Sequence, residues 1–486
     1  MTGDDRLPVV VAGAQVVERG ELVGALDLAE RAAAGALDQV PGLGRSLGRL
    51  SVVGILSPVG PAPATALAGR LGLSPAVCET TTIGGNTPQL LVTRAAADIA
   101  AGRLDATLIV GAEAMRSARA GHRRPAKDAL GHPDPAVGDG RLGTGDAENA
   151  IGLILPLHLY AMFESAIARR AGRSFDEHRA AMGRLLAPFT EVAARHPCAW
   201  FTARRSAAEI ADPSPANRIA AEPYTKRMAA FLNVDQSAAV VVCSLAAARA
   251  AGVAGQAVFI WSGADCHDVW TPAARPDLTA SPAIAAAAGA CLEAGGTGAD
   301  DLHALDLYSC FPAAVEAAAR AVGVDLDDRR GLTVTGGLPY FGGPGNNYST
   351  HAIATMADVL RTRGGASLGL VGALGWYTTK HSYGLYGASP PRGGFVAADT
   401  AARQRQIDSS ALTVALGAEG EATVEAATVV YDGESVGAAP VIATLDDGRR
   451  VVAAAAAGGL ASLAGRNLAG SRVRVTGTPP SYEVIA

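Results

Sequence analysis

The sequence has 486 residues, of which 49% are hydrophobic and 18% charged, and its formal net charge is −5. A chain of this length exceeds one ordinary domain, so we expect two to four structural units with large buried cores. The mild negative charge, without a long basic run, argues against a nucleic-acid partner, and no uninterrupted apolar stretch has the length of a membrane span.

The N-terminus and the cysteines favour a cytoplasmic protein. The first residues, MTGDDRLPVVVAG, are acidic and lead into a buried-strand pattern, which is not the pattern of a signal peptide. The six cysteines, at positions 78, 198, 243, 266, 291 and 310, form no CxxC pair. We therefore expect reduced cysteines that pack as small hydrophobic side chains, with neither a disulfide framework nor a metal site.

The N-terminal part alternates between strand and helix patterns, as α/β proteins do. A continuous apolar run over 7–13 predicts a strand that is buried on both faces. The pattern then favours a helix over 22–37, a strand over 50–56 and another strand over 107–112.

The stretch over 80–102 is the first candidate for a site. A glycine turn, Gly84-Gly85, leads into Asn86-Thr87-Pro88 and then an alanine-rich helix. An N-cap Asn or Thr with proline at the first helical position is a helix start signal. A helix N-terminus reached through glycines presents free backbone N–H groups and the positive end of the helix dipole, so it can hold an oxyanion or expose a nucleophile.

The middle of the chain, about residues 117–222, predicts an insertion, which we call the excursion. A second α/β half follows it. Residues 117–148 are polar and rich in Gly, Pro and Asp, as surface segments are. Helical patterns resume over 157–171 and 175–194, and strand–helix patterning returns over 223–253. The second half begins near position 257 with VFIWSGADC, an alanine-rich helix and ALDLYSCFP.

An internal repeat supports two similar halves. Asn86 is followed by a helix and then TLIVGA, which begins at position 107, and Asn347 is followed by a helix and then LGLVGA, which begins at position 368. Both pairs are offset by 261 residues (347 − 86 and 368 − 107). We expect two similar βα units whose helix N-termini face each other in one site.

The C-terminal tail has a different pattern. After ASPPRGG, residues alternate with period two and contain Asp-Gly turns, which predicts a small antiparallel barrel or sandwich. The tail carries no obvious catalytic group, so we interpret it as a packing or assembly module.

Together these stretches resemble the thiolase superfamily over about residues 7–390. GAEAM (111–115) resembles the thiolase segment that ends in a Gly-Gly-Met-Glu-Ser-Met-type motif. DLYSCFP (306–312) lies where thiolases carry Asn-Glu-Ala-Phe and sterol-carrier-protein-linked thiolases carry His-Asp-Cys-Phe, and GGLPYFGGPGNN (336–347) resembles the Gly-His-Pro loop. The barrel-like tail narrows the resemblance to type 1 thiolase-like proteins, which have an additional C-terminal domain of OB type.

The resemblance implies a five-layered αβαβα core of two similar halves and a small C-terminal β-barrel domain. It divides the chain into an N-terminal half (1–116 and 223–255), a loop domain (117–222) that helps to bind coenzyme A, a C-terminal half (256–390) and the additional domain (405–486). Thiolases are usually dimers or tetramers, whereas this type can be monomeric, so a monomer and a homodimer both stay open.

The resemblance also places the catalytic positions of the family, and three expected groups are missing. A thiolase uses a cysteine at the first helix N-terminus as acyl acceptor, a histidine in the Gly-His-Pro loop and a second cysteine as acid/base. Family spacing puts the nucleophile at Gly85 and the histidine at Gly343, and VGALGW (371–376) lacks the second cysteine. We therefore do not expect the standard reaction.

Other side chains stay as catalytic candidates. Tyr308 lies at the oxyanion-hole position of the family. A tyrosine at this position is a similarity to the steroid side-chain aldolases of the thiolase-like group. Carbon–carbon cleavage by those aldolases needs proton transfer but no acyl-enzyme. Cys310 matches the cysteine of His-Asp-Cys-Phe, which can serve as acid/base in that branch. His351 and His381 are further candidates for proton transfer. Candidates for binding the substrate or an oxyanion are Gly85, Asn86, Gly343, Asn346, Asn347 and Tyr348, and Lys226 is a candidate for a coenzyme A phosphate.

Each candidate also has a structural interpretation. Tyr308 and Tyr348 can place a hydroxyl at a buried hydrogen bond, and Cys310 can fill the core. The two histidines can be structural, the asparagines can be turn and cap residues, and Lys226 can be a solvated surface lysine.

The sequence leaves three functions open. The first is a thiolase-like protein that binds an acyl-CoA thioester and performs acyl-transfer or carbon–carbon bond chemistry without a cysteine acyl-enzyme. The second is a catalytically silent coenzyme A-binding or scaffolding member. The third is an acyltransferase with an unrecognised nucleophile.

Overall fold

The computed structural model describes residues 3–121, 133–456 and 458–485. Its first α/β half contains the predicted strands and helices and two further elements, the helix α2 and the strand β3, whose sequence VCETT has little apolar pattern. The elements of this half, before the excursion, are β1 (Pro8–Val17), α1 (Ala25–Asp38), β2 (Arg49–Val52), α2 (Pro63–Arg70), β3 (Val77–Thr81), α3 (Thr87–Ala100) and β4 (Ala106–Ala114).

The sheet of this half is completed by a strand from beyond the excursion. Strand β8 (Asp235–Ser244) lies between β1 and β4 and pairs antiparallel with both. All ten of its residues are buried, because helices cover both faces of the sheet, and small and β-branched side chains suit that position. The helix α9 (Leu245–Ala250) follows it.

The second half contains a sheet with the strand order β10-β11-β12-β9. Its strand β9 also pairs with β1 through Val9–Phe259 and Val10–Val258, which joins the two sheets into one of eleven strands that includes β13 (Val396–Ala397). The elements of this half are β9 (Val258–His267), α10 (Pro282–Ala294), β10 (Ala304–Asp306), α11 (Pro312–Val322), α12 (Tyr348–Arg363), β11 (Leu368–Gly375) and β12 (Lys380–Gly387).

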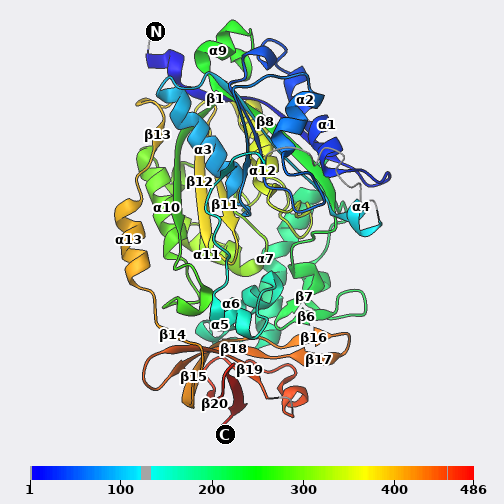
Figure 1. Ribbon diagram of the computed structural model, residues 1–486, viewed down its shortest axis with the longest axis vertical. Helices are drawn as coiled ribbons and strands as arrows, with labels where there is room; N and C mark the ends of the chain where they lie inside the picture. The colour runs from blue at the N-terminus through cyan, green and yellow to red at the C-terminus, as the bar shows by residue number, and fades with distance from the viewer. Residues whose placement is uncertain (1–2, 122–132, 457, 486) are drawn as a thin grey trace.

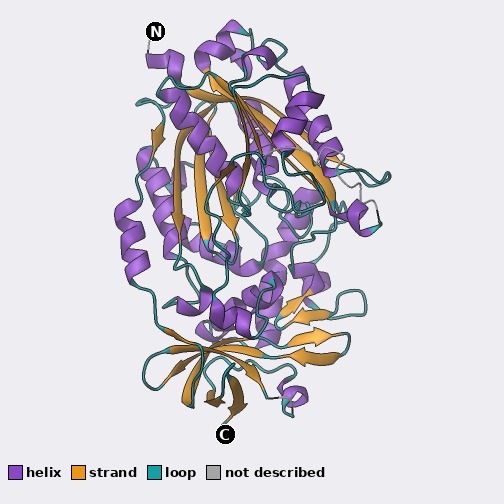
Figure 2. Cartoon of the chain, in the orientation of Figure 1, coloured by secondary structure: helices purple, strands orange, loops and turns teal. Residues whose placement is uncertain are grey.

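Two helices fill the space between the sheets, and this confirms the five-layered αβαβα core (Figures 1 and 2). Helices α3 and α12 pack on strands of both halves, whereas α1 packs on the outer face of the first sheet and α10 on that of the second. The predicted repeat agrees with these elements. Adding 261 to the bounds of α3 and β4 gives 348–361 and 367–375, and α12 and β11 span 348–363 and 368–375.

The excursion is mainly helical. The predicted helices over 157–171 and 175–194 correspond to α6 (Pro156–Arg170) and α7 (Phe175–Arg195). Residues 122–132 of the predicted polar stretch lie outside the described residues. The other elements of the excursion are α4 (Met115–Arg119), β5 (Ala136–Val137), α5 (Asp146–Ala150), α8 (Ala207–Ala211) and β6 (Ile219–Ala221), and β7 (Tyr224–Thr225) follows.

The tail forms the predicted barrel. Strands β19-β18-β15-β20-β21 form a closed ring, because β19 also pairs with β21, and this closing pair is parallel whereas the sequence predicted antiparallel strands. The predicted Asp-Gly turns connect β16 to β17 and β18 to β19, with positive φ at Gly433 (64°) and Gly448 (87°). The elements of this region are α13 (Ala401–Ser409), β14 (Val414–Ala415), β15 (Gly420–Ala427), β16 (Val430–Asp432), β17 (Ser435–Ala438), β18 (Pro440–Leu445), β19 (Arg450–Ala455), β20 (Arg472–Thr476) and β21 (Ser481–Val484).

The barrel region and the excursion share a sheet. Strand β16 pairs with β6 through Val430 and Ala221, which gives a four-stranded sheet with the order β17-β16-β6-β7 (Figure 1). The backbone N–H of Ala427 also donates to Ser165 Oγ on α6 at 2.9 Å. Within the described residues, no helix combines the length and apolar character needed to cross a membrane.

Candidate functional site

The glycine turn before α3 lies against the start of α12. The backbone N–H of Gly84 donates to Asn346 Oδ1 at 2.9 Å, and Ser349 Oγ donates to the carbonyl oxygen of Gly85 at 3.0 Å. Within the described part of the chain, the backbone N–H groups of Gly85 and Asn86 have no hydrogen-bond partner. The two repeat helices thus begin side by side, and two free donors remain at the N-terminus of α3.

The three candidate asparagines connect the halves and do not cap the helices. Asn86 and Asn347 are the N-cap residues of α3 and α12, but neither side chain makes a capping hydrogen bond. Asn86 Nδ2 donates to Ser382 Oγ at 3.3 Å, Asn346 Nδ2 to the carbonyl oxygen of Gly54 at 2.7 Å, and Asn347 Nδ2 to that of Gly111 at 2.6 Å. Their amides are used for contacts between segments that are far apart in sequence.

Position 85 has no space for a side chain. A Cβ on Gly85 would overlap the hydroxyl oxygen of Tyr308, and it would lie 2.6 Å from the carbonyl oxygen of Leu374. A real Cβ does not approach other atoms so closely, so only glycine fits without a shift of its neighbours. The phenol of Tyr308 therefore takes the space that the side chain at the expected nucleophile position would need.

Tyr308 is 7% exposed, and its hydroxyl makes no hydrogen bond with the described residues. Burial raises the pKa of Tyr308 well above its usual value, and the nearby Cys310 adds to the effect. The phenol is therefore protonated at neutral pH, and it can donate a hydrogen bond or a proton but is a poor base.

Cys310 is also protonated at neutral pH. Burial raises the pKa of its thiol to about 12, while a hydrogen bond with Tyr160 partly offsets this rise. Tyr160 in turn accepts from the backbone N–H of Thr378 at 2.9 Å. Among the described residues no cation acts on the pKa of this thiol, so it lacks the electropositive surroundings that generate a thiolate.

Tyr348 belongs to a buried network under the site. Its hydroxyl donates to Asp306 Oδ1 at 3.1 Å and lies 2.6 Å from Thr335 Oγ1. Its ring meets that of Tyr308 edge to face, with centroids 5.4 Å apart. Burial raises the pKa of Asp306 to about 6, and the hydrogen bonds that it accepts oppose this rise. Tyr348 thus supports the ring of Tyr308.

The structure does not bring His351 into contact with Gly85 or Tyr308. His351 Nδ1 lies 2.9 Å from Gln15 Oε1 on β1, and Nε2 has no partner among the described residues. Burial lowers its pKa to about 3, with a smaller contribution from His196. A fully buried, neutral imidazole that faces β1 fits the structural interpretation.

His381 and Lys380 point to opposite faces of β12, because successive side chains alternate along a strand. His381 Nε2 lies 3.4 Å from the hydroxyl of Ser281, the N-cap residue of α10 on the outer face. Burial lowers the pKa of His381 to about 3. Lys380 Nζ instead donates to the carbonyl oxygen of Ile83 at 2.6 Å, directly before the glycine turn.

Lys380 is thus the cationic side chain beside the turn. It is 5% exposed, its Nζ also donates to the carbonyl oxygen of Asp139 at 3.1 Å, and its Nζ would lie 2.9 Å from a Cβ on Gly84. Burial lowers its pKa to about 8, which the charge of Asp139 partly opposes.

Gly343 lies in a loop beside aromatic side chains. Its backbone N–H donates to the carbonyl oxygen of Phe231 at 2.9 Å, and a Cβ on it would lie 3.1 Å from Leu232. Phe231 packs edge to face against Phe201, with centroids 4.8 Å apart, and Phe201 and Leu232 are 36% and 45% exposed. The expected histidine position is therefore bordered by an exposed apolar group.

Lys226 begins a 3₁₀ turn that ends at Met228, and it is exposed. Its side chain makes neither a hydrogen bond nor an ion pair within the residues that the structure describes. This geometry suits both a phosphate contact and a solvated surface lysine.

Comparison with known proteins identifies the family. Neither a family model nor a curated protein matches the chain. Among solved structures, a monomeric SCP2-thiolase-like protein type 1 from Mycobacterium smegmatis is 32% identical, with 99% of this chain and 100% of that chain covered and a TM-score of 0.86. The chain belongs to the thiolase superfamily, as an SCP2-thiolase-like protein.

Thiolases and an aldolase share the fold of this SCP2-thiolase-like protein at lower identity. The acetyl-CoA acetyltransferase from Syntrophomonas wolfei is 18% identical over 79% of this chain and 99% of that one, with a TM-score of 0.57. The Ltp2-ChsH2(DUF35) aldolase is also 18% identical, over 79% and 98% of the two chains, with a TM-score of 0.60. The likeness to these two proteins concerns the fold.

Sequence reasoning missed Lys380 in this SCP2-thiolase-like protein. The sequence shows Lys380 and His381 next to each other, and only His381 was selected as a catalytic candidate, although both lie on β12. Because side chains alternate along a strand, only one of Lys380 and His381 can face α3. The turn before α3 was already the expected site. Testing both faces of the strand would have identified the lysine as a candidate.

Proposed function

We propose that this SCP2-thiolase-like protein binds a coenzyme A thioester and makes or breaks a carbon–carbon bond without a cysteine acyl-enzyme. The observation that carries this proposal is the phenol of Tyr308 in the space beside Gly85. A site that lacks a nucleophile but holds a proton donor suits aldol-type chemistry, in which no acyl group is transferred to the protein.

The reaction would proceed through an enolate of the thioester. In the cleavage direction, the β-hydroxyl group gives its proton to a water molecule, the Cα–Cβ bond breaks, a carbonyl product leaves, and the electron pair moves onto the thioester oxygen. The free N–H groups of Gly85 and Asn86, at the positive end of α3, suit that oxyanion. Tyr308, protonated at neutral pH, then suits protonation of the enolate carbon. Once Tyr308 has protonated the enolate, its phenolate takes a proton back from water, so no net proton is gained or lost.

The surroundings favour an acyl thioester as substrate. The exposed apolar group of Phe201, Phe231 and Leu232 beside Gly343 offers a surface for an acyl chain. Lys226 is exposed and lies just after the excursion, from where it would contact a phosphate of coenzyme A. We propose that the chain is divided into the four segments expected from the sequence and that the excursion over 117–222 helps to bind coenzyme A. The Mycobacterium relative is described as monomeric, and we propose a monomer here as well.

A second candidate is a catalytically silent coenzyme A-binding protein. It is favoured by the protonated thiol of Cys310 and by His351 and His381, whose low pKa values of about 3 and burial remove them from proton transfer at neutral pH. In this case the barrel region would serve as a packing or recruitment module.

Acid quenching after incubation with a radiolabelled acyl-CoA separates the candidates. We expect calorimetry to show coenzyme A binding and the quenched protein to carry no label, with product formed only if the protein is an enzyme. A stable acyl-protein adduct would contradict both candidates and indicate an unrecognised nucleophile. Failure of both acyl-CoA and coenzyme A to bind would contradict them as well.

A further inference from the structure

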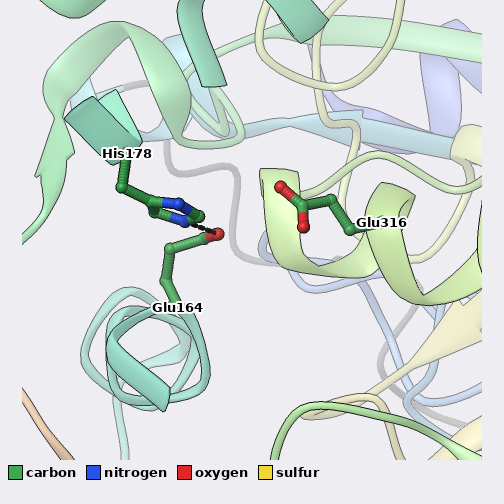
Figure 3. Close-up of side chains that lie close together, drawn as sticks. All are labelled: Glu164, His178 and Glu316. Carbon is green, nitrogen blue, oxygen red and sulfur yellow. Dashed lines mark hydrogen bonds and ion pairs between the residues drawn. The ribbon is translucent and has the colours of Figure 1, made fainter. Parts of the chain in front are cut away.

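Three buried ionisable side chains meet away from the candidate site, between the excursion and the second half. Glu164 on α6, His178 on α7 and Glu316 on α11 each offer one potential ligand atom, and these atoms all lie within 4.8 Å of one another. Glu164 and His178 are 0% exposed and Glu316 is 9% exposed. Figure 3 shows the Glu316 carboxylate turned toward the other two.

Two of the three side chains are already paired. His178 Nε2 lies 2.6 Å from Glu164 Oε1, and Tyr224 Oη donates to Glu164 Oε2 at 2.5 Å. These two hydrogen bonds account for both oxygens of Glu164 and for one nitrogen of His178.

Glu316 and one nitrogen of His178 have no such explanation. The Glu316 carboxylate makes no hydrogen bond and no ion pair with the described residues, although it is nine-tenths buried. His178 Nδ1 is buried and has no partner there either. A buried carboxylate without a partner is costly, so the cluster is incomplete as a purely structural unit.

The charges of the cluster call for a cation. Burial and the neighbouring Glu164 raise the pKa of Glu316, because two carboxyl groups face each other there. Of the charged groups that oppose this rise, Arg173 and Arg320 are exposed. A protonated His178 would balance one carboxylate only. A divalent cation would balance both and leave the imidazole neutral, which is the form that binds metals.

We propose that Glu164, His178 and Glu316 bind one divalent transition-metal ion, with Zn²⁺ as the best fit. One imidazole and two carboxylates are a ligand set that zinc accepts, at roughly 2.0–2.2 Å from each ligand. Ligand atoms around such an ion lie about 3.4 Å apart, so Glu316 moves inward and the His178–Glu164 hydrogen bond opens as the metal enters. The ion would link α6 and α7 of the excursion to α11 of the second half.

The test is zinc binding by the full-length protein after removal of metals with a chelator. We expect one Zn²⁺ per chain by calorimetry and elemental analysis, and a rise in the unfolding midpoint of roughly 5 °C at saturating zinc. The Glu316→Gln variant should lose this rise and bind at least tenfold more weakly. Glu222→Gln is a matched control, since Glu222 is a buried carboxylate of the same region that pairs with Arg179, and it should bind zinc as the wild type does.

Cobalt provides a readout that does not depend on the folding of a variant. The Co²⁺-loaded wild type should show the visible bands of nitrogen and oxygen ligation, without the intense near-ultraviolet band of a cobalt–thiolate bond. That thiolate band would place the metal on a cysteine and overturn the proposal. So would the absence of stoichiometric binding by the wild type, or unchanged affinity in a folded Glu316→Gln variant.

Discussion

The hydroxyl of Tyr308 fills the space in which a side chain at position 85 would begin. Tyr308 comes from the segment after β10, and Gly85 comes from the turn before α3, more than 200 residues earlier in the chain. The two residues are therefore coupled, because a side chain at position 85 would have to displace both the phenol of Tyr308 and the carbonyl oxygen of Leu374. The phenol of Tyr308 thus occupies the space that a nucleophilic side chain at position 85 would need.

Enlarging Gly85 should destabilise the protein through Tyr308. Gly85→Ala should reduce the free energy of unfolding by about 1–3 kcal/mol, because the added methyl overlaps the phenol and lies close to the carbonyl oxygen of Leu374. The double variant Gly85→Ala/Tyr308→Ala should cost less than the sum of the two single variants, since the larger overlap is then relieved. Urea unfolding of the four proteins measures this coupling. Strictly additive free energies would show that the two side chains do not compete for the same space.

Removing one hydroxyl should separate catalysis from stability. Tyr308→Phe should change the free energy of unfolding by less than about 0.5 kcal/mol, because the hydroxyl bonds to no described residue. Turnover of a β-hydroxyacyl-CoA should fall about 10²–10⁴-fold, with coenzyme A affinity retained, if Tyr308 transfers the proton.

Tyr348→Phe is the matched control for this prediction. It removes a hydroxyl that bonds to Asp306 and Thr335, so it should cost about 1–3 kcal/mol of stability. Equal turnover by wild type and Tyr308→Phe would contradict a proton-transfer role for Tyr308.

The amine of Lys380 should titrate near neutral pH. The chain contains only three lysines, at positions 127, 226 and 380, so ¹³Cε-lysine labelling gives a simple NMR spectrum. We expect a signal with a pKa of about 8 that is absent from Lys380→Met.

The sign of the linked stability change follows from that pKa. Between pH 8 and 10.5 the folded protein binds fewer protons at Lys380 than the unfolded chain does, so this group should make the protein more stable as the pH rises through that interval. Urea unfolding at several pH values in wild type and Lys380→Met measures the difference. A Lys380 signal that titrates only above pH 10 would contradict the burial of its amine.

Asp306 should give the opposite dependence at lower pH. Its pKa is raised from 3.8 to about 6 in the folded protein, so the folded state binds more protons than the unfolded state between these values. The contribution of Asp306 to the free energy of unfolding should therefore fall by up to about 3 kcal/mol as the pH rises from 4 to 6. Asp306→Asn should show a shallower decline than wild type. An identical pH dependence in both proteins would mean that Asp306 ionises normally.

Local patterns predicted the strands, the repeat and the barrel, whereas the five layers were implied by the resemblance to thiolases. Apolar runs gave the buried strands, Asn86 and Asn347 marked two helix starts with a constant offset, and Asp-Gly pairs marked the barrel turns. The strand β3 was missed because VCETT is half-exposed and has no apolar pattern.

The side chains of the site were harder to predict because their orientation depends on tertiary packing. The spacing of the family placed Gly85 and Tyr308 in one site. It did not predict that the phenol of Tyr308 fills the space of a side chain at position 85. His351 and His381 were selected for their chemistry, whereas their burial against β1 and α10 lowers the pKa of each to about 3. Lys380 was overlooked because nothing in a single sequence says which face of β12 meets the turn. The cluster of Glu164, His178 and Glu316 comes from three separate helices, and its members show no common spacing.

The pairing of β16 with β6 means that the barrel cannot be cut away cleanly. Val430 of β16 lies opposite Ala221 of β6 in the antiparallel pair, and the backbone N–H of Glu222 donates to the carbonyl oxygen of Val429 at 2.9 Å. A chain shortened before β14 would keep β6 and β7 as a bare hairpin with an open edge, and open strand edges recruit other chains. The tail therefore covers the edge of β6 that a shortened chain would leave open.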